Sequence, residues 1–339
     1  MSLRRLALAI HGAVSTSGPP EPRTALIFVL NSAFLRPFHV LAYSLARVRT
    51  LTKYPIIVIS EDAAVFRDPL VRAVTDHQIL AGPEQIAEFA NISPERVRED
   101  LRKGWIAKYT FLKWLVFQDY GYDRHIYIDA DIVALNDCEH LAALSEHDLY
   151  GAPVFKRDLI IDETGARRPV VEREQRMSAF LADGNERSLN SGVMVINRRA
   201  MEPEFRAGLI ATAESKPYTV EQAVVRDFIR RSDRYSMGAL SSYDNFNHGF
   251  LASLSAPTQL KHLDRVRLLH YVGADKKPWN AAYIDDPTRI ERLTDSLWRI
   301  LERESRTASP LTRRAAQRLD RLEKRAASPA VEEAVEDQL

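Results

Sequence analysis

Short, unbroken apolar runs alternate with amphipathic stretches in the first part of the chain. Residues 25–30 and 55–60 form two such runs, each of a length typical of a strand that is buried on both faces. Between them, residues 35–48 carry apolar side chains at the spacing of a helix with one buried face. A strand, a helix and a second strand in this order predict a βαβ unit and therefore a parallel sheet.

The same alternation continues along the chain. Further strands are predicted at residues 124–128, 190–197 and 267–272, and further helices at residues 85–101, 105–117 and 221–230. No internal repeat interrupts this order. The pattern predicts an α/β fold with a mixed, mostly parallel sheet that is flanked by helices.

The two ends of the chain depart from this pattern. Two arginines and a short apolar stretch near the start resemble a signal sequence, but His11 interrupts the stretch. Residues 1–23 are therefore expected to form a loose leader, and residues 24–285 the functional domain. Residues 286–339 are expected to form a helical, basic and partly disordered tail.

The basic charge of this tail has two interpretations. Residues 299–325 contain nine basic and four acidic residues, with leucines at intervals. A solvated helix explains this composition. The alternative is an amphipathic surface that rests on an anionic membrane, which would make the protein membrane-associated.

Composition excludes several classes of function. The chain has 339 residues, of which 45% are hydrophobic, and 47 basic against 46 acidic residues, so no excess of charge favours a nucleic acid as partner. Cys138 is the single cysteine, which excludes an intramolecular disulfide and a thiolate metal site. Any metal must therefore be held by oxygen and nitrogen ligands, and a reducing, cytoplasmic location is expected.

Two acids follow the predicted strand at residues 124–128. Asp129 and Asp131 are separated by one residue and stand where an α/β sheet binds its ligands, at the carboxyl end of a strand. Carboxylates crowded together repel each other unless a cation neutralises them, and oxygen ligands favour a hard divalent ion such as magnesium or manganese. The alternative, without a metal site, is a pair of acids in an ordinary turn after a strand.

The acid pair also suits a phosphatase of the haloacid dehalogenase type, with Asp129 as the nucleophile. Such a domain normally opens with this strand, whereas here about 100 residues of strand and helix pattern precede it. The chain also lacks a convincing acidic pair further on for the magnesium of such an enzyme. This interpretation is therefore the weaker one.

Six segments in a fixed order decide between these alternatives. They are LNSAF at residues 30–34, WIAKY at 105–109, DAD at 129–131, LNSGVMVIN at 189–197, EQ at 221–222 and LHYVGADKKPW at 269–279. Together they resemble the retaining glycosyltransferases of family eight, the group that contains glycogenin and the bacterial lipopolysaccharide galactosyl- and glucosyltransferases. The resemblance spans most of the chain.

The resemblance implies a fold, a donor and a cofactor. The fold is expected to be the Rossmann-like GT-A type. The donor is expected to be a UDP-sugar, with galactose or glucose as the most frequent hexose, and the acceptor a free or lipid-linked saccharide. Manganese is expected as the cofactor, with magnesium as the alternative. A second class of function stays open, namely a protein that binds a nucleotide sugar without turnover.

The resemblance assigns residues to the nucleotide. Leu30 and Asn31 belong to the turn that binds the nucleotide, and Phe34 is expected to stack on uracil, although it lacks the hydroxyl that is common there. Asp62, at the end of the second apolar run, is expected to join this site. Lys108 is expected to contact the donor through its positive charge.

The resemblance also assigns the metal site and a loop beside it. Asp129, Asp131 and His270 are expected to hold the metal, and Ala130 to line the donor site between the two acids. A lysine in the loop after His270 is expected to bind the diphosphate and to close over the donor. This loop starts at Gly273 and is one residue longer than usual, so both lysines are candidates, and the second is slightly favoured: Lys276 and Lys277.

The remaining assignments concern the sugar and the acceptor. Three residues are expected to line the sugar pocket, where a glycine permits close approach: Asn190, Ser191 and Gly192. Gln222 is expected to support the positively charged anomeric centre as a residue too weak to act as a nucleophile. Glu221 stands where an aspartate is more usual. Asp183 is expected near the acceptor, with an ordinary turn as the alternative.

Overall fold

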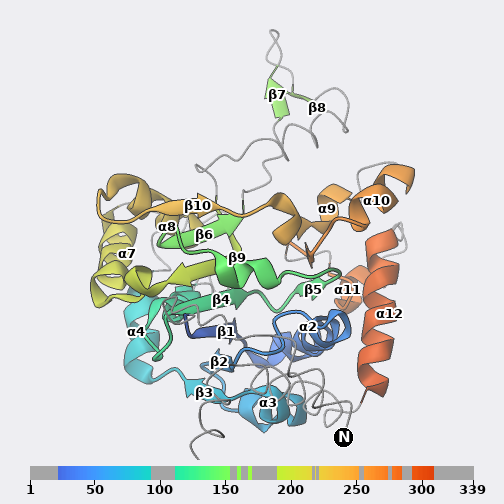
Figure 1. The fold of residues 1–339 in the computed structure, drawn as a ribbon, viewed down its shortest axis with the longest axis horizontal. Helices are drawn as coiled ribbons and strands as arrows, with labels where there is room; N and C mark the ends of the chain where they lie inside the picture. Colours follow the sequence, from blue (N-terminus) through green and yellow to red (C-terminus); the bar gives the residue numbers. More distant parts are fainter. Residues whose placement is uncertain are drawn as a thin grey trace, which may run out of the picture.

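A seven-stranded sheet runs through the centre of the protein (Figure 1), in the order β10-β6-β9-β4-β1-β2-β3. The computed structural model describes residues 22–92, 111–152, 159–161, 167–169, 189–215, 218, 221–251, 256–273, 277–284 and 292–308. The strands of the sheet are, in chain order, β1 Thr24–Val29, β2 Ile56–Ser60, β3 His77–Leu80, β4 Arg124–Ile128, β6 Leu149–Ala152, β9 Asn190–Asn197 and β10 Met237–Ala239.

The sheet is mixed but mostly parallel. β1 pairs in parallel with β2 and β4, β2 pairs in parallel with β3, and β6 pairs in parallel with β10. Only β9 in this sheet runs the other way, between β4 and β6. The predicted α/β class with a mostly parallel sheet is therefore confirmed.

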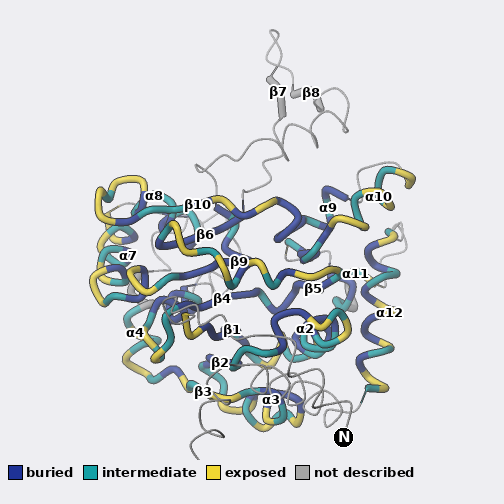
Figure 2. The backbone as a smooth tube through the Cα atoms, viewed as in Figure 1, coloured by how far each residue is buried: buried dark blue, intermediate teal, exposed yellow. Residues whose placement is uncertain are grey.

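Helices cover both faces of this sheet (Figures 1 and 2). α2 and α3 pack on one face, and α4, α7, α8 and the 3-10 helix η3 pack on the other. The helices are α2 Leu35–Val48, α3 Pro69–Val74, α4 Pro83–Ile92, α7 Pro203–Ser215, α8 Glu221–Arg231, α9 His248–Leu251, α10 Ala256–Leu263, α11 Ala281–Ile284 and α12 Leu293–Thr307.

The two-sided cover explains why the first strand is an unbroken apolar run. Ala25 and Ile27 of β1 belong to the hydrophobic cluster on one face, whereas Leu26 and Phe28 belong to the cluster on the other. All four side chains are buried. Each strand residue therefore loses apolar surface to solvent, at about 25 cal/mol per Å², whichever way it points.

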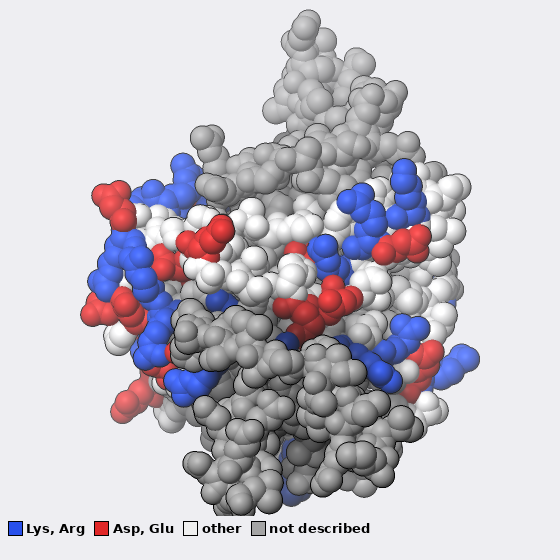
Figure 3. All heavy atoms as spheres, viewed as in Figure 1, with Lys and Arg blue, Asp and Glu red and all other residues white. Residues whose placement is uncertain are grey.

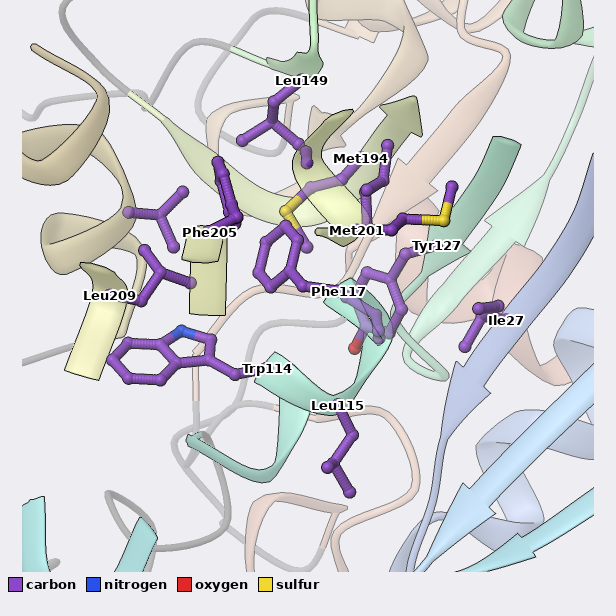
Figure 4. Packing of buried hydrophobic residues seen from close by; sticks show 14 of the residues in the cluster. Ile27, Trp114, Leu115, Phe117, Tyr127, Leu149, Met194, Met201, Phe205 and Leu209 are labelled. Atoms are coloured by element: carbon purple, nitrogen blue, oxygen red, sulfur yellow. The ribbon is translucent and has the colours of Figure 1, made fainter. Parts of the chain in front are cut away.

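An aromatic cluster attaches η3, Lys113–Phe117, to the sheet (Figure 4). Phe117 packs against Phe205 of α7 with 5.0 Å between ring centroids, and Trp114 and Tyr127 are fully buried in the same cluster. Residues 111–112 are helical and η3 follows directly, so the predicted helix at residues 105–117 ends in a tighter turn. This packing holds η3 beside β4.

A small sheet of three strands extends from the central one. It has the order β11-β12-β5, with β5 Ile132–Ala134, β11 Phe246–Asn247 and β12 Leu268–His270. β12 runs antiparallel to β5, with His270 opposite Ile132. The strand predicted at residues 267–272 is therefore shorter than expected, and its last residue lies beside the segment that joins β4 to β5. β7 Leu159–Ile161 and β8 Arg167–Pro169 form a separate two-stranded ladder.

The predicted tail contains a helix, α12, that packs against α2 (Figure 1). Trp298 and Leu301 of α12 are buried, and the Trp298 ring lies 4.3 Å from that of Trp279. Tyr43 of α2 donates a hydrogen bond to Glu304 over 2.9 Å. Residues 309–339 and the predicted leader up to residue 21 lie outside the described residues. None of the described helices has the length and apolar character needed to cross a membrane.

A buried histidine gives the fold a predictable response to pH. His125 of β4 hydrogen-bonds through Nδ1 to the carbonyl oxygen of Val116 over 2.9 Å, and its Nε2 has no partner among the described residues. Because a carbonyl only accepts, Nδ1 carries the proton and Nε2 is bare. Burial lowers the pKa of His125 to about 4, against 6.5 for an unperturbed histidine.

We expect acid to destabilise the protein through this residue. Between pH 6.5 and pH 4 the unfolded chain binds a proton at His125 that the folded chain does not, so stability falls as the pH falls. From pH 7 to pH 5 the free energy of unfolding falls by about 2 kcal/mol through this residue. Urea unfolding at both pH values measures it. The amide of the variant His125→Asn can still donate to Val116 but does not titrate. From pH 7 to pH 5 its free energy of unfolding should therefore fall by about 2 kcal/mol less than that of the wild type, and an equal fall in both proteins would contradict the prediction.

Candidate active site

The two acids of the DAD segment lie where the chain passes from the central sheet to the small sheet. Asp129 follows β4 directly, and Asp131 precedes β5. The Asp129 N–H donates to the carbonyl of Gly192 over 2.7 Å, and the carbonyl of Asp131 accepts from the Tyr271 N–H over 3.0 Å. Ala130 is buried between them. Backbone hydrogen bonds to β9 and to the residue that follows β12 therefore fix the backbone that carries both carboxylates.

His270 completes a cluster with these acids. Its Nε2 lies 3.2 Å from Asp131 Oδ1 and 3.8 Å from Asp129 Oδ2. One ligand atom from each of the three residues lies within 4.8 Å of the others. Two carboxylate oxygens and an imidazole nitrogen that converge in this way form a donor set that suits a divalent ion such as manganese or magnesium.

Lys277 lies on the other oxygen of Asp131. Its ammonium group donates to Asp131 Oδ2 and to the carbonyl of Tyr271, and it lies 5.4 Å from the centre of the Trp279 ring. Burial favours the neutral form of Asp131, but the positive charge of Lys277 outweighs burial and holds the pKa of Asp131 well below its usual range. The carboxylate is therefore ionised and available as a ligand.

A second buried lysine, which the sequence analysis missed, lies on the Asp129 side. Lys113 Nζ is 3.0 Å from Asp129 Oδ1 and 3.4 Å from Glu221 Oε1, and it donates to Ser191 Oγ over 3.2 Å. Burial opposes its charge, but Asp129 and Glu221 outweigh burial and raise the pKa of Lys113. Its sequence signal is a single charge within an otherwise apolar run, FLKWLVF at residues 111–117.

The predicted Glu221-Gln222 pair joins this group at the start of α8. Glu221 is buried and accepts a hydrogen bond of 2.5 Å from Ser191 Oγ. Gln222 Oε1 accepts from the backbone N–H of Ser191 over 3.3 Å. The longer side chain of Glu221 therefore reaches both Ser191 and Lys113, and residues from η3, β9 and α8 meet at one place.

Gly192 has a structural reason that differs in part from the predicted one. A Cβ atom at this position would lie 2.4 Å from Cε1 and 2.6 Å from Nδ1 of His270. A glycine is therefore required here for close approach, as predicted, and within the described residues the approaching group is the imidazole of His270. Gly273, which opens the loop to Lys277, has a φ of +105°, a conformation that glycine adopts at little cost.

The predicted nucleotide turn lies at the carboxyl ends of β1 and β2. Leu30 is buried, and Asn31 caps a short 3-10 helix, η1 Ser32–Phe34, by accepting from the Ala33 N–H over 3.1 Å. Ser32 donates to Asp62, which also accepts from the Ala64 N–H, and these bonds lower the pKa of Asp62. The Phe34 side chain is 37% exposed, so a face of its ring is accessible. Because β1 and β4 are parallel neighbours, this turn and Asp129 lie at the same edge of the sheet.

Three predicted site residues cannot be placed. Lys108, Asp183 and Lys276 lie outside the described residues.

Comparisons with known proteins identify the family and the fold. The sequence profile of glycosyl transferase family 8 matches residues 25–282. The fold is similar to that of the galactosyltransferase LgtC, solved with donor and acceptor sugar analogues, with a TM-score of 0.53 and 17% identity over 86% of this chain and 99% of LgtC. The search of curated proteins returned no match.

A second similar structure is the glycosyltransferase GlyE of Streptococcus pneumoniae TIGR4. It has a TM-score of 0.51 and 17% identity over 86% of this chain, which spans 63% of the length of GlyE. Likeness at this level of identity concerns the fold alone. The family match covers most of the chain and includes the acid pair, His270 and the start of α8. The chain therefore belongs to glycosyl transferase family 8.

Proposed function

We propose that this glycosyltransferase transfers a hexose, galactose or glucose, from a UDP-sugar to a saccharide or a lipid-linked saccharide, with retention of anomeric configuration. The proposed cofactor is manganese, which magnesium can replace. The observation that carries the proposal is the convergence of Asp129, Asp131 and His270 at the carboxyl end of β4. The family match displaces the phosphatase alternative.

The diphosphate is the group that must leave, and it gains negative charge as it does so. Asp129, Asp131 and His270 would hold the ion, which supplies compensating positive charge when bound. Lys277 is the second source of positive charge that we assign to the phosphates, because its buried ammonium already lies at Asp131. Its loop begins at Gly273 and would order over the donor and exclude water.

The sugar is assigned to the polar group at the start of α8. Gln222 accepts from Ser191 through the same amide oxygen that would face the positively charged anomeric centre. An amide is a poor nucleophile, so the acceptor hydroxyl attacks directly, from the face that the diphosphate leaves. Lys113 lies between Glu221 and Asp129, forms an ion pair with each of them and can donate to a sugar hydroxyl.

The nucleotide is assigned to the turn after β1. The accessible ring of Phe34 would stack on uracil, and Asn31 and Asp62 lie in the same turn network. Leu30 would form the buried floor of this turn. Contacts of the donor or acceptor with three residues outside the described ranges remain predictions: Lys108, Asp183 and Lys276.

Peripheral contact with a membrane is a further part of the proposal. The outward face of α12 exposes Arg299 and Arg303 together with Leu293 (40% exposed) and Ile300 (56% exposed). The acid Glu302 is turned to the protein and pairs with Arg36. On the face shown in Figure 3, basic and acidic side chains are otherwise interspersed. A helix with arginines beside exposed aliphatic side chains suits an anionic lipid surface.

A donor assay separates the classes of function. The purified protein is incubated with individual UDP-sugars and Mn²⁺, with and without a saccharide acceptor, and released UDP is measured. We expect release of UDP from UDP-galactose or UDP-glucose, and its loss in excess EDTA because the acids then lack their cation. Release of inorganic phosphate would favour a phosphatase. Binding of UDP without any release would favour a nucleotide-sugar-binding protein.

Removal of the imidazole tests the metal site directly. We expect His270→Ala to weaken Mn²⁺ binding by more than about 100-fold, because one of three protein ligands is lost, whereas loss of only the hydrogen-bond partner of a ligand typically costs about 10-fold to 100-fold. Activity should recover partly at high Mn²⁺. Titration calorimetry with Mn²⁺ in the presence of UDP measures the change. His77→Ala is the control, because His77 lies on the exposed edge strand β3. An unchanged affinity of His270→Ala for Mn²⁺ would exclude the proposed ligand set.

Gln222 offers a test of the chemical step. We expect Gln222→Ala to lower kcat by about 100-fold while the dissociation constant of the UDP-sugar changes little, because the amide acts on charge that develops only in the transition state. Steady-state kinetics and equilibrium dialysis with the labelled donor measure the two quantities. Loss of donor binding in this variant would instead show that Gln222 holds the ground state.

A further inference from the structure

A buried asparagine, which the sequence analysis did not single out, lies against the imidazole of His270. Asn245 lies between the 3-10 helix η6, Ser242–Asp244, and β11, and its side chain is buried. Its Oδ1 is 2.8 Å from His270 Nδ1, and its Nδ2 is 2.9 Å from Asn190 Oδ1. Asn190 Oδ1 in turn accepts from the backbone N–H of Gly192 over 2.9 Å.

The direction of each hydrogen bond in this series, from Gly192 to His270, follows from the first bond, which the Gly192 N–H donates. A backbone N–H can only donate, so the Asn190 atom that faces Gly192 is the carbonyl oxygen. The Asn245 atom that faces this oxygen must then be the NH₂ group. Its carbonyl oxygen consequently faces His270, which must carry its proton on Nδ1.

In the neutral imidazole, this protonation leaves Nε2 of His270 with a lone pair. Nε2 is the nitrogen that faces the acids, 3.2 Å from Asp131 Oδ1 and 3.8 Å from Asp129 Oδ2. A histidine binds a metal through an unprotonated nitrogen, and the partner of its other nitrogen decides which one is unprotonated. Asn245 therefore meets the requirement for presenting Nε2 to a cation.

We propose that Asn245 is a positioning residue for His270, and that the relay from Gly192 through Asn190 and Asn245 fixes the tautomer and the orientation of this metal ligand. The proposal rests on the metal site of the proposed function and adds to it a residue that contacts neither metal nor donor. The relay also joins the segment assigned to the sugar pocket to the metal site.

Two further contacts make the relay specific to this imidazole. The carbonyl oxygen of Gly192 also accepts from the Asp129 N–H over 2.7 Å, so the backbone of one residue orients two ligands. The backbone of His270 is held independently, because its carbonyl accepts from Nδ1 of the buried His248 over 3.2 Å. Asn245 is thus needed for the side chain of His270 and not for the course of β12.

The test compares two substitutions of nearly equal size. Asn245→Leu removes both hydrogen bonds, whereas Asn245→Asp keeps an acceptor for His270 Nδ1 and loses the donor to Asn190. Asn136→Ala is the matched control, because Asn136 donates to the backbone carbonyls of Asp264 and Val266 and contacts no ligand residue. Circular dichroism verifies that each variant is folded.

The first readout is the affinity for Mn²⁺, measured in the full-length chain from the electron paramagnetic resonance signal of the free ion. We expect Asn245→Leu to weaken binding by about 10-fold to 100-fold, as is typical for a lost partner of a ligating histidine, and Asn245→Asp to restore it to within about 3-fold. The control should bind as the wild type does. Equal affinities of the wild type and Asn245→Leu would overturn the proposal, because a side chain that merely fills space is replaced by leucine without effect on the metal.

The second readout needs no metal. In metal-free protein at pH 8.5, ¹⁵N spectra of labelled histidine, assigned with His270→Gln, report which nitrogen carries the proton. We expect the Nδ1–H tautomer in the wild type and in Asn245→Asp, and a shift toward Nε2–H in Asn245→Leu. An Nε2–H tautomer in the wild type would overturn the relay. Absence of Mn²⁺ binding in a wild type that shows Nδ1–H would count against the proposed metal site alone.

Discussion

The antiparallel pairing of β12 with β5 places His270 beside the acids that end β4, and the site depends on this pairing. It brings together segments about 140 residues apart and crowds acidic groups into a poorly solvated place. Two lysines make this arrangement tolerable: Lys113 pairs with Asp129, and Lys277 pairs with Asp131. Buried charges that lacked such partners would cost several kcal/mol each. With Glu221, which also pairs with Lys113, the site holds three carboxylates and two ammonium groups. This small excess of negative charge favours the entry of a diphosphate together with its divalent cation.

Much of the central architecture could be predicted because burial leaves a local trace in the sequence. β4 and β9 have the predicted bounds, since strands covered on both faces contain a run of apolar residues, and α2 has the predicted bounds because one face alone is buried. The edge strand β3 gave no such signal, since its side chains are mostly exposed. The identity of the acids and of His270 followed from the order of motifs in the family, and the structure brings these residues together.

Other features depend on contacts that no local pattern encodes. Lys113 belongs to the same predicted helix as Lys108, and no local pattern singles it out; only the packing of η3 on β4 shows that Lys113 faces Asp129. The need for glycine at position 192 arises from an imidazole 78 positions later in the chain. Asn245 belongs to no periodic pattern, and its importance becomes visible only when the donors and acceptors around it are traced one by one.

The stacking of Trp279 on Trp298 has a consequence for where the catalytic unit ends. Trp279 follows Lys277 by two residues, and the Tyr271 hydroxyl donates to the carbonyl of Thr294 over 2.6 Å, so both ends of the lysine loop rest on α12. A chain shortened at residue 285 would keep every proposed ligand and yet leave this loop without its aromatic support. We therefore propose that the catalytic unit includes all of α12, to Thr307. This helix would then both support the loop that binds the phosphates and carry the surface that we assign to lipid. Binding to a membrane and binding of the donor would then depend on the same helix.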